Sequence, residues 1–357
     1  MVDIARELVY LQIMKILVDQ FVPYAVETLS PLAEAISVDG RNLTPEDVRD
    51  ADALIVRTRT RCNAQLLDGA ERLRFVGTAT IGYDHIDQPY LRSRGVRFTS
   101  AAGCNSRAVL QWVAASLAHL AKVQGWRPEE RTLGVFGVGH VGSLVVEYAR
   151  SWGFRVLCSD PPRECAEGLG EKDGFFAPEE ILRQADIVTL HTPLLREGEC
   201  PTFHLADDEF LSRLKDGAVL LNASRGEVAD TAALLRHKDR LTYCIDVWEG
   251  EPDNINLQLL DAALIATPHI AGYSAQGKAN ASAIVIDVLA ETLGLDELRG
   301  WYPEGVRRSE PRTISWEEMC GVVDDYCHLV EETERMKRNP HDLENRRNTY
   351  PLREEFF

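Results

Sequence analysis

Three residues in the second half of the chain could together bind an acid and move a proton. Arg225 and His269 each follow shortly after an apolar run, and Glu251 lies between them in the sequence. A guanidinium can hold a carboxylate through two parallel hydrogen bonds, and an imidazole can exchange a proton with a hydroxyl near neutral pH. A carboxylate at the other ring nitrogen would fix the tautomer and favour the imidazolium. These residue types predict oxidation of a hydroxy acid, with histidine taking the hydroxyl proton.

Other interpretations of the same residues remain open. A single arginine such as Arg225 is often only a surface residue. His191 also comes directly after an apolar run, and it is the main alternative to His269 as the base.

A glycine-rich turn supplies a place for the oxidant. Gly137, Gly139 and Gly142 stand in the order G-x-G-x-x-G, after the apolar run Thr132–Phe136 and before a helix-like segment, Val141–Trp152. The first glycine permits a tight turn, the second lets the backbone approach a pyrophosphate, and the third allows close packing of helix on strand. Backbone N–H groups at the helix start would face the phosphates. The sequence therefore predicts a dinucleotide-binding site.

Asp160 completes this pattern. It follows a second predicted strand, Arg155–Ser159, at about the distance from the glycines where a carboxylate holds the ribose hydroxyls. Such a carboxylate would repel the extra phosphate of NADP and thus favours NAD.

Short apolar runs alternate with helix-like segments along most of the chain, which indicates parallel βαβ units. The predicted strands outside the glycine region are Ile16–Val18, Ala53–Val56, Phe75–Gly77, Ile187–Leu190, Val219–Asn222, Tyr243–Ile245 and Leu264–Ala266. The later strands each end in a polar cluster, so we expect these clusters at one edge of a doubly wound sheet, where such folds bind ligands.

Helix-like segments separate the strands. They are Tyr24–Glu34, which Pro31 interrupts, Ala108–Lys122, which we interpret as an interdomain connector, and Ser274–Leu293, which could cross back to the first domain. Beyond Gly300 the sequence becomes richer in charge and proline, and a helix-like stretch, Trp316–Arg338, precedes a polar tail.

Composition excludes several classes of protein. The 357 residues are 45% hydrophobic and 27% charged, which is ordinary for a globular protein of more than one domain. The net charge of −17 disfavours nucleic-acid binding. The eight cysteines lack metal-site spacing, so we expect reduced thiols in the cytoplasm and no metal. No apolar run could span a membrane, and Met1–Gln12 lacks a signal-peptide pattern, so the domain could start at Met1 or at Met14.

Taken together, the motifs resemble those of the D-2-hydroxyacid dehydrogenases over about Lys15 to Leu293. The matching residues are Gly137-x-Gly139-x-x-Gly142, Asp160, Ser224-Arg225-Gly226, Asp246-Val247-Trp248, Glu251-Pro252 and Pro268-His269, in the order found in that family.

The resemblance implies an α/β fold with two doubly wound parallel-sheet domains. A flavodoxin-like substrate domain would comprise residues 1–107 and 273–297, and a Rossmann NAD-binding domain would comprise residues 108–272. A small α+β segment, residues 298–357, would serve dimerisation, although it is shorter than the corresponding family segment. The protein would then be a homodimer that binds neither nucleic acid nor membrane.

The resemblance also implies roles for individual residues. The catalytic residues would be Arg225, Glu251 and His269. Contacts with NAD are implied for Gly137, Gly139, Gly142, Asp160, Thr192, Ala223, Ser224, Arg225, Asp246 and Gly272. Contacts with the substrate are implied for Thr58, Thr80 and Tyr273. The chain has Thr58 where serine is expected and Ser224 where cysteine is expected, and both changes keep a small or hydroxyl-bearing side chain.

The substrate implied is a phosphorylated 2-hydroxy acid, with Arg57, Arg59 or Arg61 as candidates to bind its phosphate. Two alternatives remain. The chain could be a family member of the phosphoglycerate or glyoxylate/hydroxypyruvate type, or a non-catalytic regulator that senses NAD(H). The presence of Arg225, Glu251 and His269 together argues against the regulator.

Overall fold

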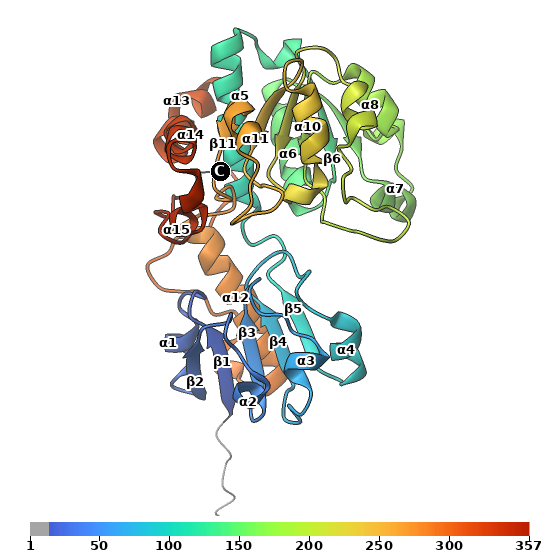
Figure 1. Ribbon diagram of the computed structural model, residues 1–357. Helices are drawn as coiled ribbons and strands as arrows, with labels where there is room; N and C mark the ends of the chain where they lie inside the picture. Colours follow the sequence, from blue (N-terminus) through green and yellow to red (C-terminus); the bar gives the residue numbers. More distant parts are fainter. Residues whose placement is uncertain (1–13, 357) are drawn as a thin grey trace, which may run out of the picture. The chain divides into compact units, whose positions relative to one another are not determined.

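The computed structural model describes residues 14–356, which form two compact units. The first unit contains residues 14–104 and 278–306, and the second contains residues 105–277 and 307–356. Each unit has one parallel sheet (Figure 1). The choice between Met1 and Met14 as the start, and the missing signal-peptide pattern, concern residues 1–13, which lie outside the described residues.

The first unit has a five-stranded sheet in the order β2-β1-β3-β4-β5. Its strands are β1 (Lys15–Asp19), β2 (Glu34–Val38), β3 (Ala53–Val56), β4 (Phe75–Thr78) and β5 (Arg97–Ser100). Its helices are α1 (Ala25–Leu29), α2 (Pro45–Val48), α3 (Ala64–Leu67), α4 (Gln88–Ser93), most of α12 (Ala275–Leu293) and the 3₁₀ turn η4 (Asp296–Leu298). All strand pairs are parallel, as the alternating pattern predicts.

The central strands of this sheet are buried on both faces. Residues of β3 and β4 are completely covered, because α12 packs on one face while α2, α3 and α4 pack on the other. Gly77 shows how closely α12 approaches, since a Cβ atom at this position would lie 2.4 Å from Cγ1 of Val285.

The two edge strands, β2 and β5, were not predicted. The helix-like segment Tyr24–Glu34 is wrong at its end: α1 stops at Leu29, and Glu34 is the first residue of β2. The physical reason is that edge strands are covered only partly, so β2 and β5 lack the continuous apolar run that marks a buried parallel strand.

The second unit has a six-stranded sheet and most of the helices. Its strands are β6 (Thr132–Phe136), β7 (Arg155–Ser159), β8 (Ile187–Leu190), β9 (Val219–Asn222), β10 (Thr242–Ile245) and β11 (Ile265–Ala266). Its helices are α5 (Ser106–Gln124), α6 (His140–Trp152), α7 (Pro161–Glu167), α8 (Pro178–Gln184), α9 (Asp208–Ser212), α10 (Thr231–His237), α11 (Leu257–Ala262), α13 (Trp316–Tyr326), α14 (Leu329–Arg338) and α15 (Leu343–Asn348). Its 3₁₀ turns are η1 (Pro128–Glu130), η2 (Glu171–Asp173), η3 (Gly226–Val228) and η5 (Pro340–Asp342).

The strand order, β11-β10-β9-β8-β6-β7, reverses direction between β6 and β8. All pairs are parallel, so the carboxyl ends of the six strands lie along one edge. In open α/β sheets a ligand binds at such a reversal, outside the carboxyl ends. The predicted doubly wound sheet, with its polar clusters along one edge, is therefore confirmed.

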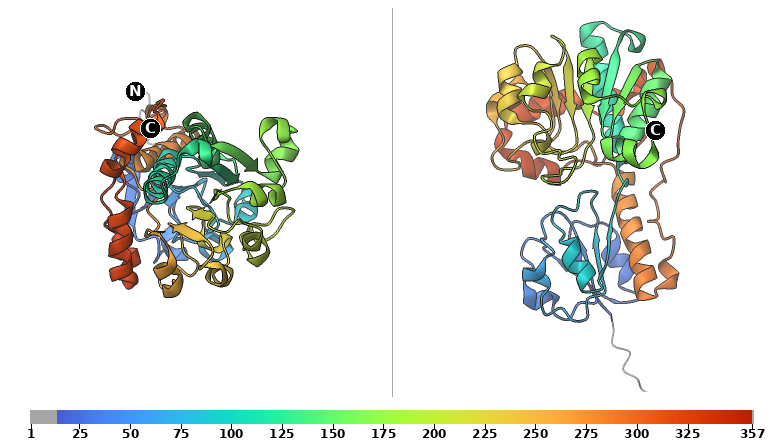
Figure 2. Two further views of the ribbon diagram at one scale, coloured as in Figure 1. Left: turned by 90° about the horizontal axis from the view of Figure 1, so that it is seen from above. Right: turned by 90° about the vertical axis from the view of Figure 1, so that its right-hand side faces the viewer.

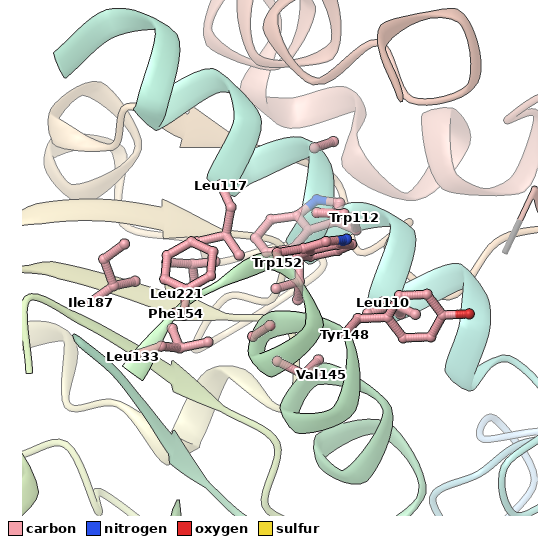
Figure 3. Close-up of a cluster of buried hydrophobic side chains, with 14 of the residues drawn as sticks. Leu110, Trp112, Leu117, Leu133, Val145, Tyr148, Trp152, Phe154, Ile187 and Leu221 are labelled. Carbon is pink, nitrogen blue, oxygen red and sulfur yellow. The ribbon is translucent and has the colours of Figure 1, made fainter. Parts of the chain in front are cut away.

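Both faces of this sheet are covered by helices (Figure 2). One face carries α5 and α6, whose indoles Trp112 and Trp152 lie among aliphatic side chains such as Leu133 and Leu221 (Figure 3). The other face carries α8, α9, α10 and α11. Because successive residues of a strand point to opposite faces, the two clusters fix the register of each strand.

The C-terminal segment packs against the second unit, with α13 against α5 and α14 against both α5 and β11 (Figure 1). The predicted stretch Trp316–Arg338 is two helices, which separate at Cys327 and His328. Within residues 298–356 the expected β content amounts to a single bridge, formed by Arg353 with Ser274. Among residues 14–356, no helix combines the length and apolar character that a bilayer span requires.

Candidate active site

The glycine turn has the geometry of a dinucleotide-binding turn. Gly137 has a φ of +83°, and a Cβ atom there would lie 2.8 Å from the carbonyl group of His191. At Gly142 a Cβ atom would lie 2.0 Å from the carbonyl oxygen of Gly137. At Gly139, by contrast, a Cβ atom would meet no atom within 4 Å. Two glycines are therefore required by the turn itself, and the third borders open space beside the turn.

Asp160, at the end of β7, is tied to this turn. Its carboxylate accepts hydrogen bonds from the backbone N–H groups of Val138, at 2.7 Å, and of Arg163, at 3.2 Å. The guanidinium of Arg163 donates to the carbonyl oxygen of Val138 at 2.8 Å and to Glu167 at 2.7 Å. Arg163 is thus engaged with Glu167 and with the turn, while the half-buried carboxylate of Asp160 is the group that favours NAD over NADP.

Two polar atoms after β8 lack partners. Nδ1 of His191 and Oγ1 of Thr192 are buried and make no hydrogen bond to any described residue. Nε2 of His191 is hydrogen-bonded to Oγ1 of Thr189 at 2.9 Å, and burial lowers the pKa of His191 to about 3. A buried neutral imidazole of this kind is a weak base, which favours His269 for proton transfer. The unpartnered atoms beside Gly137 fit a polar ligand at the turn.

The loop after β9 presents Arg225. Oδ1 of Asn222 accepts hydrogen bonds from the backbone N–H of Ser224, at 3.1 Å, and from its hydroxyl, at 2.8 Å. Nδ2 of Asn222 donates to the carbonyl oxygen of Arg225 at 3.0 Å. A Cβ atom at Gly226 would lie 2.1 Å from the backbone of Trp248, so the Arg225 loop packs directly on the loop that carries Glu251. Asn222 and Gly226 thus position Arg225, a role that the sequence alone did not reveal.

The loop that carries His269 is organised around a buried carboxylate. Asp246 accepts hydrogen bonds from the backbone N–H groups of Ile270, at 2.8 Å, and Ala271, at 2.9 Å, and from the hydroxyl of Thr267, at 2.5 Å. The backbone N–H of His269 donates to the carbonyl oxygen of Asp246 at 2.7 Å. These contacts hold His269 in a left-handed conformation, with a φ of 59°, that an isolated histidine would rarely adopt.

Glu251 and His269 form a hydrogen-bonded pair through Oε1 and Nδ1. The other carboxylate oxygen, Oε2, accepts from the backbone N–H of Trp248 at 3.0 Å. Since an ionised carboxylate can only accept, Nδ1 carries the proton and Nε2 is the acceptor of the neutral ring. Burial raises the pKa of Glu251, but the charge and hydrogen bond of His269 and the charge of Arg347 outweigh it, and this pKa lies below its ordinary value.

Three residues of the C-terminal segment reach this region, and the sequence did not predict them as part of the site. Arg353 is buried and donates to the carbonyl oxygens of Ile270, at 2.9 Å, and Ala271. Tyr350 packs edge-on against Tyr273, with ring centroids 6.4 Å apart. Nη1 of Arg347 lies 3.6 Å from Oε1 of Glu251. The only signal in the sequence was the arginine-rich run near the end of the chain, which indicates no particular neighbour.

The remaining predicted residues are divided between the units. Ala223 and Gly272 lie in the second unit, where a Cβ atom at Gly272 would lie 2.0 Å from Nδ2 of Asn105. Thr58 and Thr80 lie in the first unit, after β3 and β4. Thr58 is exposed, while Oγ1 of Thr80 donates to the carbonyl oxygen of Gly82 at 2.9 Å. The structure therefore brings the turn, Arg225, Glu251 and His269 into one unit.

One group of side chains has the composition of a metal site. Ligand atoms of His204, Asp230 and Glu249 lie within 4.8 Å of one another. The carboxylates already accept hydrogen bonds from the first turn of α10, Asp230 from Ala232 at 2.9 Å and Glu249 from Thr231 at 3.3 Å. Nε2 of His204 lies 2.8 Å from Oε1 of Glu249. Capping of α10 accounts for this arrangement, and we assign it no metal.

Comparison with known proteins places this geometry in a wider group. Residues 104–271 match the model of the D-isomer specific 2-hydroxyacid dehydrogenase NAD binding domain. An erythronate-4-phosphate dehydrogenase of Bacteroides fragilis is 43% identical over 96% of this chain and 97% of its own.

Solved structures show the same fold. A protein of Thermus thermophilus has a TM-score of 0.65 and 29% identity, covering 82% of this chain and 100% of its own. A D-lactate dehydrogenase of Aquifex aeolicus, complexed with NAD and lactic acid, has a TM-score of 0.63 and 26% identity over the same shares of the two chains.

Proposed function

Since the chain belongs to the D-isomer specific 2-hydroxyacid dehydrogenases, and among them to the erythronate-4-phosphate dehydrogenases, we propose that it oxidises 4-phospho-D-erythronate with NAD. The product would be 2-oxo-3-hydroxy-4-phosphobutanoate, an intermediate on the way to pyridoxal 5'-phosphate. The observation that carries this proposal is the Glu251–His269 pair, because it leaves an unprotonated ring nitrogen on His269 while the loop of Glu251 packs on the loop of Arg225.

Each of the three predicted catalytic residues has a different role. Arg225 binds the substrate carboxylate and so fixes C2 and its hydroxyl. Nε2 of His269 accepts the hydroxyl proton as the carbonyl forms, and Glu251 stabilises the imidazolium that results. The hydrogen bonds of Asn222 and Asp246 support this assignment, because they fix the two loops that carry Arg225 and His269.

NAD is the cofactor, and when bound it would supply the acceptor for the hydride that leaves C2 of the substrate. We assign its pyrophosphate to the turn at Gly137, Gly139 and Gly142, and its ribose hydroxyls to Asp160. The open space at Gly139 and the unpartnered hydroxyl of Thr192 support these contacts. We assign the other predicted contacts with NAD to Ala223, Ser224, Arg225, Asp246 and Gly272.

The substrate needs cationic groups for its phosphate, and the loop after β3 offers them. Arg57, Arg59 and Arg61 flank the exposed Thr58. Guanidinium groups bind phosphate through paired hydrogen bonds, and hydroxyl groups add further donors. We therefore assign the phosphate to this loop and further substrate contacts to Thr80 and Tyr273.

A panel of substrates tests the proposal. Initial rates with 4-phosphoerythronate and 3-phosphoglycerate are measured with NAD and with NADP, and those with glyoxylate and hydroxypyruvate are measured with the reduced cofactors. We expect the highest kcat/KM for 4-phosphoerythronate with NAD. A higher kcat/KM for another acid would mean that the protein is a dehydrogenase of the phosphoglycerate or glyoxylate type. NAD binding without turnover of any acid would favour a regulator.

The same panel tests the preference for NAD. Replacing Asp160 by serine removes the carboxylate and keeps a small polar side chain. Charged hydrogen bonds contribute about 1.5–3 kcal/mol, so kcat/KM with NAD should fall about 10- to 150-fold. An equal loss with NADP would contradict a role of Asp160 in choosing between the two cofactors.

We further propose a homodimer located in the cytoplasm. The C-terminal segment exposes three large apolar side chains, Tyr326, Val330 and Leu352. Such exposure in one subunit is expected where a second subunit covers the surface. All eight cysteines lie within the described residues and none forms a disulfide, which suits a reducing compartment. Light scattering of wild type and of Val330→Asp would test the dimer, because a charge at the interface should increase the fraction of monomer.

The proposed domains follow the family pattern. Residues 1–107 and 273–297 would bind substrate, residues 108–272 would bind NAD, and residues 298–357 would support dimerisation. The match of residues 104–271 to an NAD binding domain supports the second of these. Limited proteolysis, with the cleavage sites identified by mass spectrometry, would test the boundaries.

A further inference from the structure

The C-terminal segment places a cation beside the proposed catalytic pair. Nη1 of Arg347, on α15, lies 3.6 Å from Oε1 of Glu251, the same oxygen that bonds to Nδ1 of His269. One carboxylate oxygen is therefore shared between an arginine and a histidine. All three residues belong to the second unit.

Arg347 is held firmly in this position. Its side chain is only 13% exposed, and its Nε atom is buried without a hydrogen-bond partner among the described residues. The neighbouring Arg346 forms an ion pair with Glu332 of α14 at 2.7 Å, and α14 packs against β11. Arg346 thus anchors α15 to α14, and Arg347 of the same helix faces Glu251.

The other charged groups around the pair are occupied elsewhere. Asp246 bonds to the backbone of the His269 loop, and Glu249 bonds to His204 and Thr231. Arg353 donates to backbone carbonyl oxygens, and the phenol of Tyr350 is buried near it. Arg225 lies on the adjacent loop, where its guanidinium donates to the carbonyl oxygen of Ser224. Among the described residues, Arg347 is thus an arginine that forms an ion pair with the same Glu251 oxygen that bonds to His269.

We propose that Arg347 is a positioning residue for the reaction, which holds the Glu251 carboxylate in place and limits how strongly His269 retains a proton. The inference rests on the proposed function of Glu251 and His269. A fixed cation near the pair repels the imidazolium, and it weakens the electrostatic stabilisation that Glu251 gives to the imidazolium. Both effects favour the neutral ring, which is the form that accepts the hydroxyl proton. The C-terminal segment is accordingly part of the active site as well as a structural addition.

The direction of the effect follows from the charges. Removing Arg347 leaves Glu251 to stabilise the imidazolium alone, so the variant should favour the protonated ring. Oxidation needs the neutral ring, and the low-pH side of the kcat/KM profile should therefore move to higher pH. A cation at this distance should be responsible for a shift of about half to one pH unit.

The test compares three variants of the full-length protein. Arg347→Met removes the charge and keeps a long side chain, Arg347→Lys keeps the charge, and Arg346→Met alters an equally buried arginine of the same helix. The pH dependence of kcat/KM and the thermal midpoint are measured for each. We expect the pH profile of Arg347→Met to move to higher pH and that of Arg347→Lys to match wild type. The profile of Arg346→Met should also match wild type, even if its thermal midpoint falls.

A second measurement separates this proposal from the identity of the substrate. The protein is labelled with ¹⁵N-histidine, and the titration of His269, assigned with His269→Gln, is followed by NMR in wild type and Arg347→Met without any substrate. A higher pKa in the variant would support the proposal even if no acid of the panel were oxidised. An unchanged pKa, or equal shifts in Arg346→Met and Arg347→Met, would overturn it.

Discussion

Nδ1 of His269 and Oε1 of Glu251 are hydrogen-bonded although the two residues belong to loops that follow different strands. His269 follows β11, and Glu251 follows β10. Asp246 joins the two loops, because it lies at the start of one and bonds to the backbone of the other. The position of the pair is therefore set by the sheet register and by a buried carboxylate.

The first prediction concerns the proton acceptor. Replacing His269 by alanine should lower kcat about 10²- to 10⁴-fold, the usual range for loss of a general base. The Kd for NAD, measured by fluorescence titration, should change less than about twofold, since the predicted dinucleotide contacts remain. A variant with the wild-type rate would instead transfer the proton role to His191.

The second prediction separates a glycine that the fold needs from one that the ligand needs. Gly142→Ala places a Cβ atom 2.0 Å from a carbonyl oxygen, so it should lower the free energy of unfolding by about 1–3 kcal/mol or more. Gly139→Ala meets no atom within 4 Å, so its thermal midpoint should match wild type while its Kd for NAD rises about tenfold or more. Calorimetry and NAD titration of both variants provide the measurements.

This contrast between the two glycines could not be read from the sequence. The motif G-x-G-x-x-G fixes the turn, but the contact of Gly142 with the preceding backbone needs coordinates. The central strands were predicted because they are continuously apolar, and the edge strands β2 and β5 were missed because they are only partly covered.

The residues of the candidate site were likewise predicted only in part from the sequence. Gly137, Arg225, Glu251 and His269 lie in one unit as the motif order predicts, because each follows a strand of one parallel sheet. Arg347 and Arg353 were missed because they come from a tail without strands, whose place depends on how α14 and α15 pack. Local pattern predicts which residues end a strand. It does not predict which distant side chain covers them.

The third prediction concerns stability at low pH. The folded pKa of His191, about 3, lies below the value of about 6.5 in the unfolded chain. As pH falls below 6.5 the unfolded chain binds a proton that the folded protein does not, so folding becomes less favourable by up to about 1.4 kcal/mol per pH unit. Between pH 7.5 and pH 5 this residue should lower the free energy of unfolding by about 2 kcal/mol.

Urea unfolding at these two pH values checks the effect in wild type, His191→Asn and His341→Gln. The first variant should lose less stability on acidification than wild type. The second replaces an exposed histidine and should behave as wild type. Equal losses in all three proteins would show that the imidazole of His191 does not remain neutral in the folded state.

The last prediction concerns Arg353, which ties the end of the chain to the catalytic loop. Its guanidinium donates to the carbonyl oxygens of Ala108, Ile270 and Ala271, all in the interior of the second unit. Arg353→Met would remove three hydrogen bonds donated by a buried charged group, and hydrogen bonds to charged groups contribute about 1.5–3 kcal/mol each. We expect the free energy of unfolding to fall by about 3 kcal/mol or more, and kcat/KM to fall because His269 precedes this stretch directly.

Arg353→Lys provides the matched control, because it keeps the charge but cannot reach three carbonyl groups at once. It should be intermediate in stability between wild type and Arg353→Met. Hydrogen exchange of residues 267–273 should increase in the same order, since loss of these bonds frees the loop before the whole unit unfolds. Faster exchange confined to α13 and α14, with the loop unchanged, would mean that Arg353 anchors only the tail and that the catalytic loop is held by Asp246 alone.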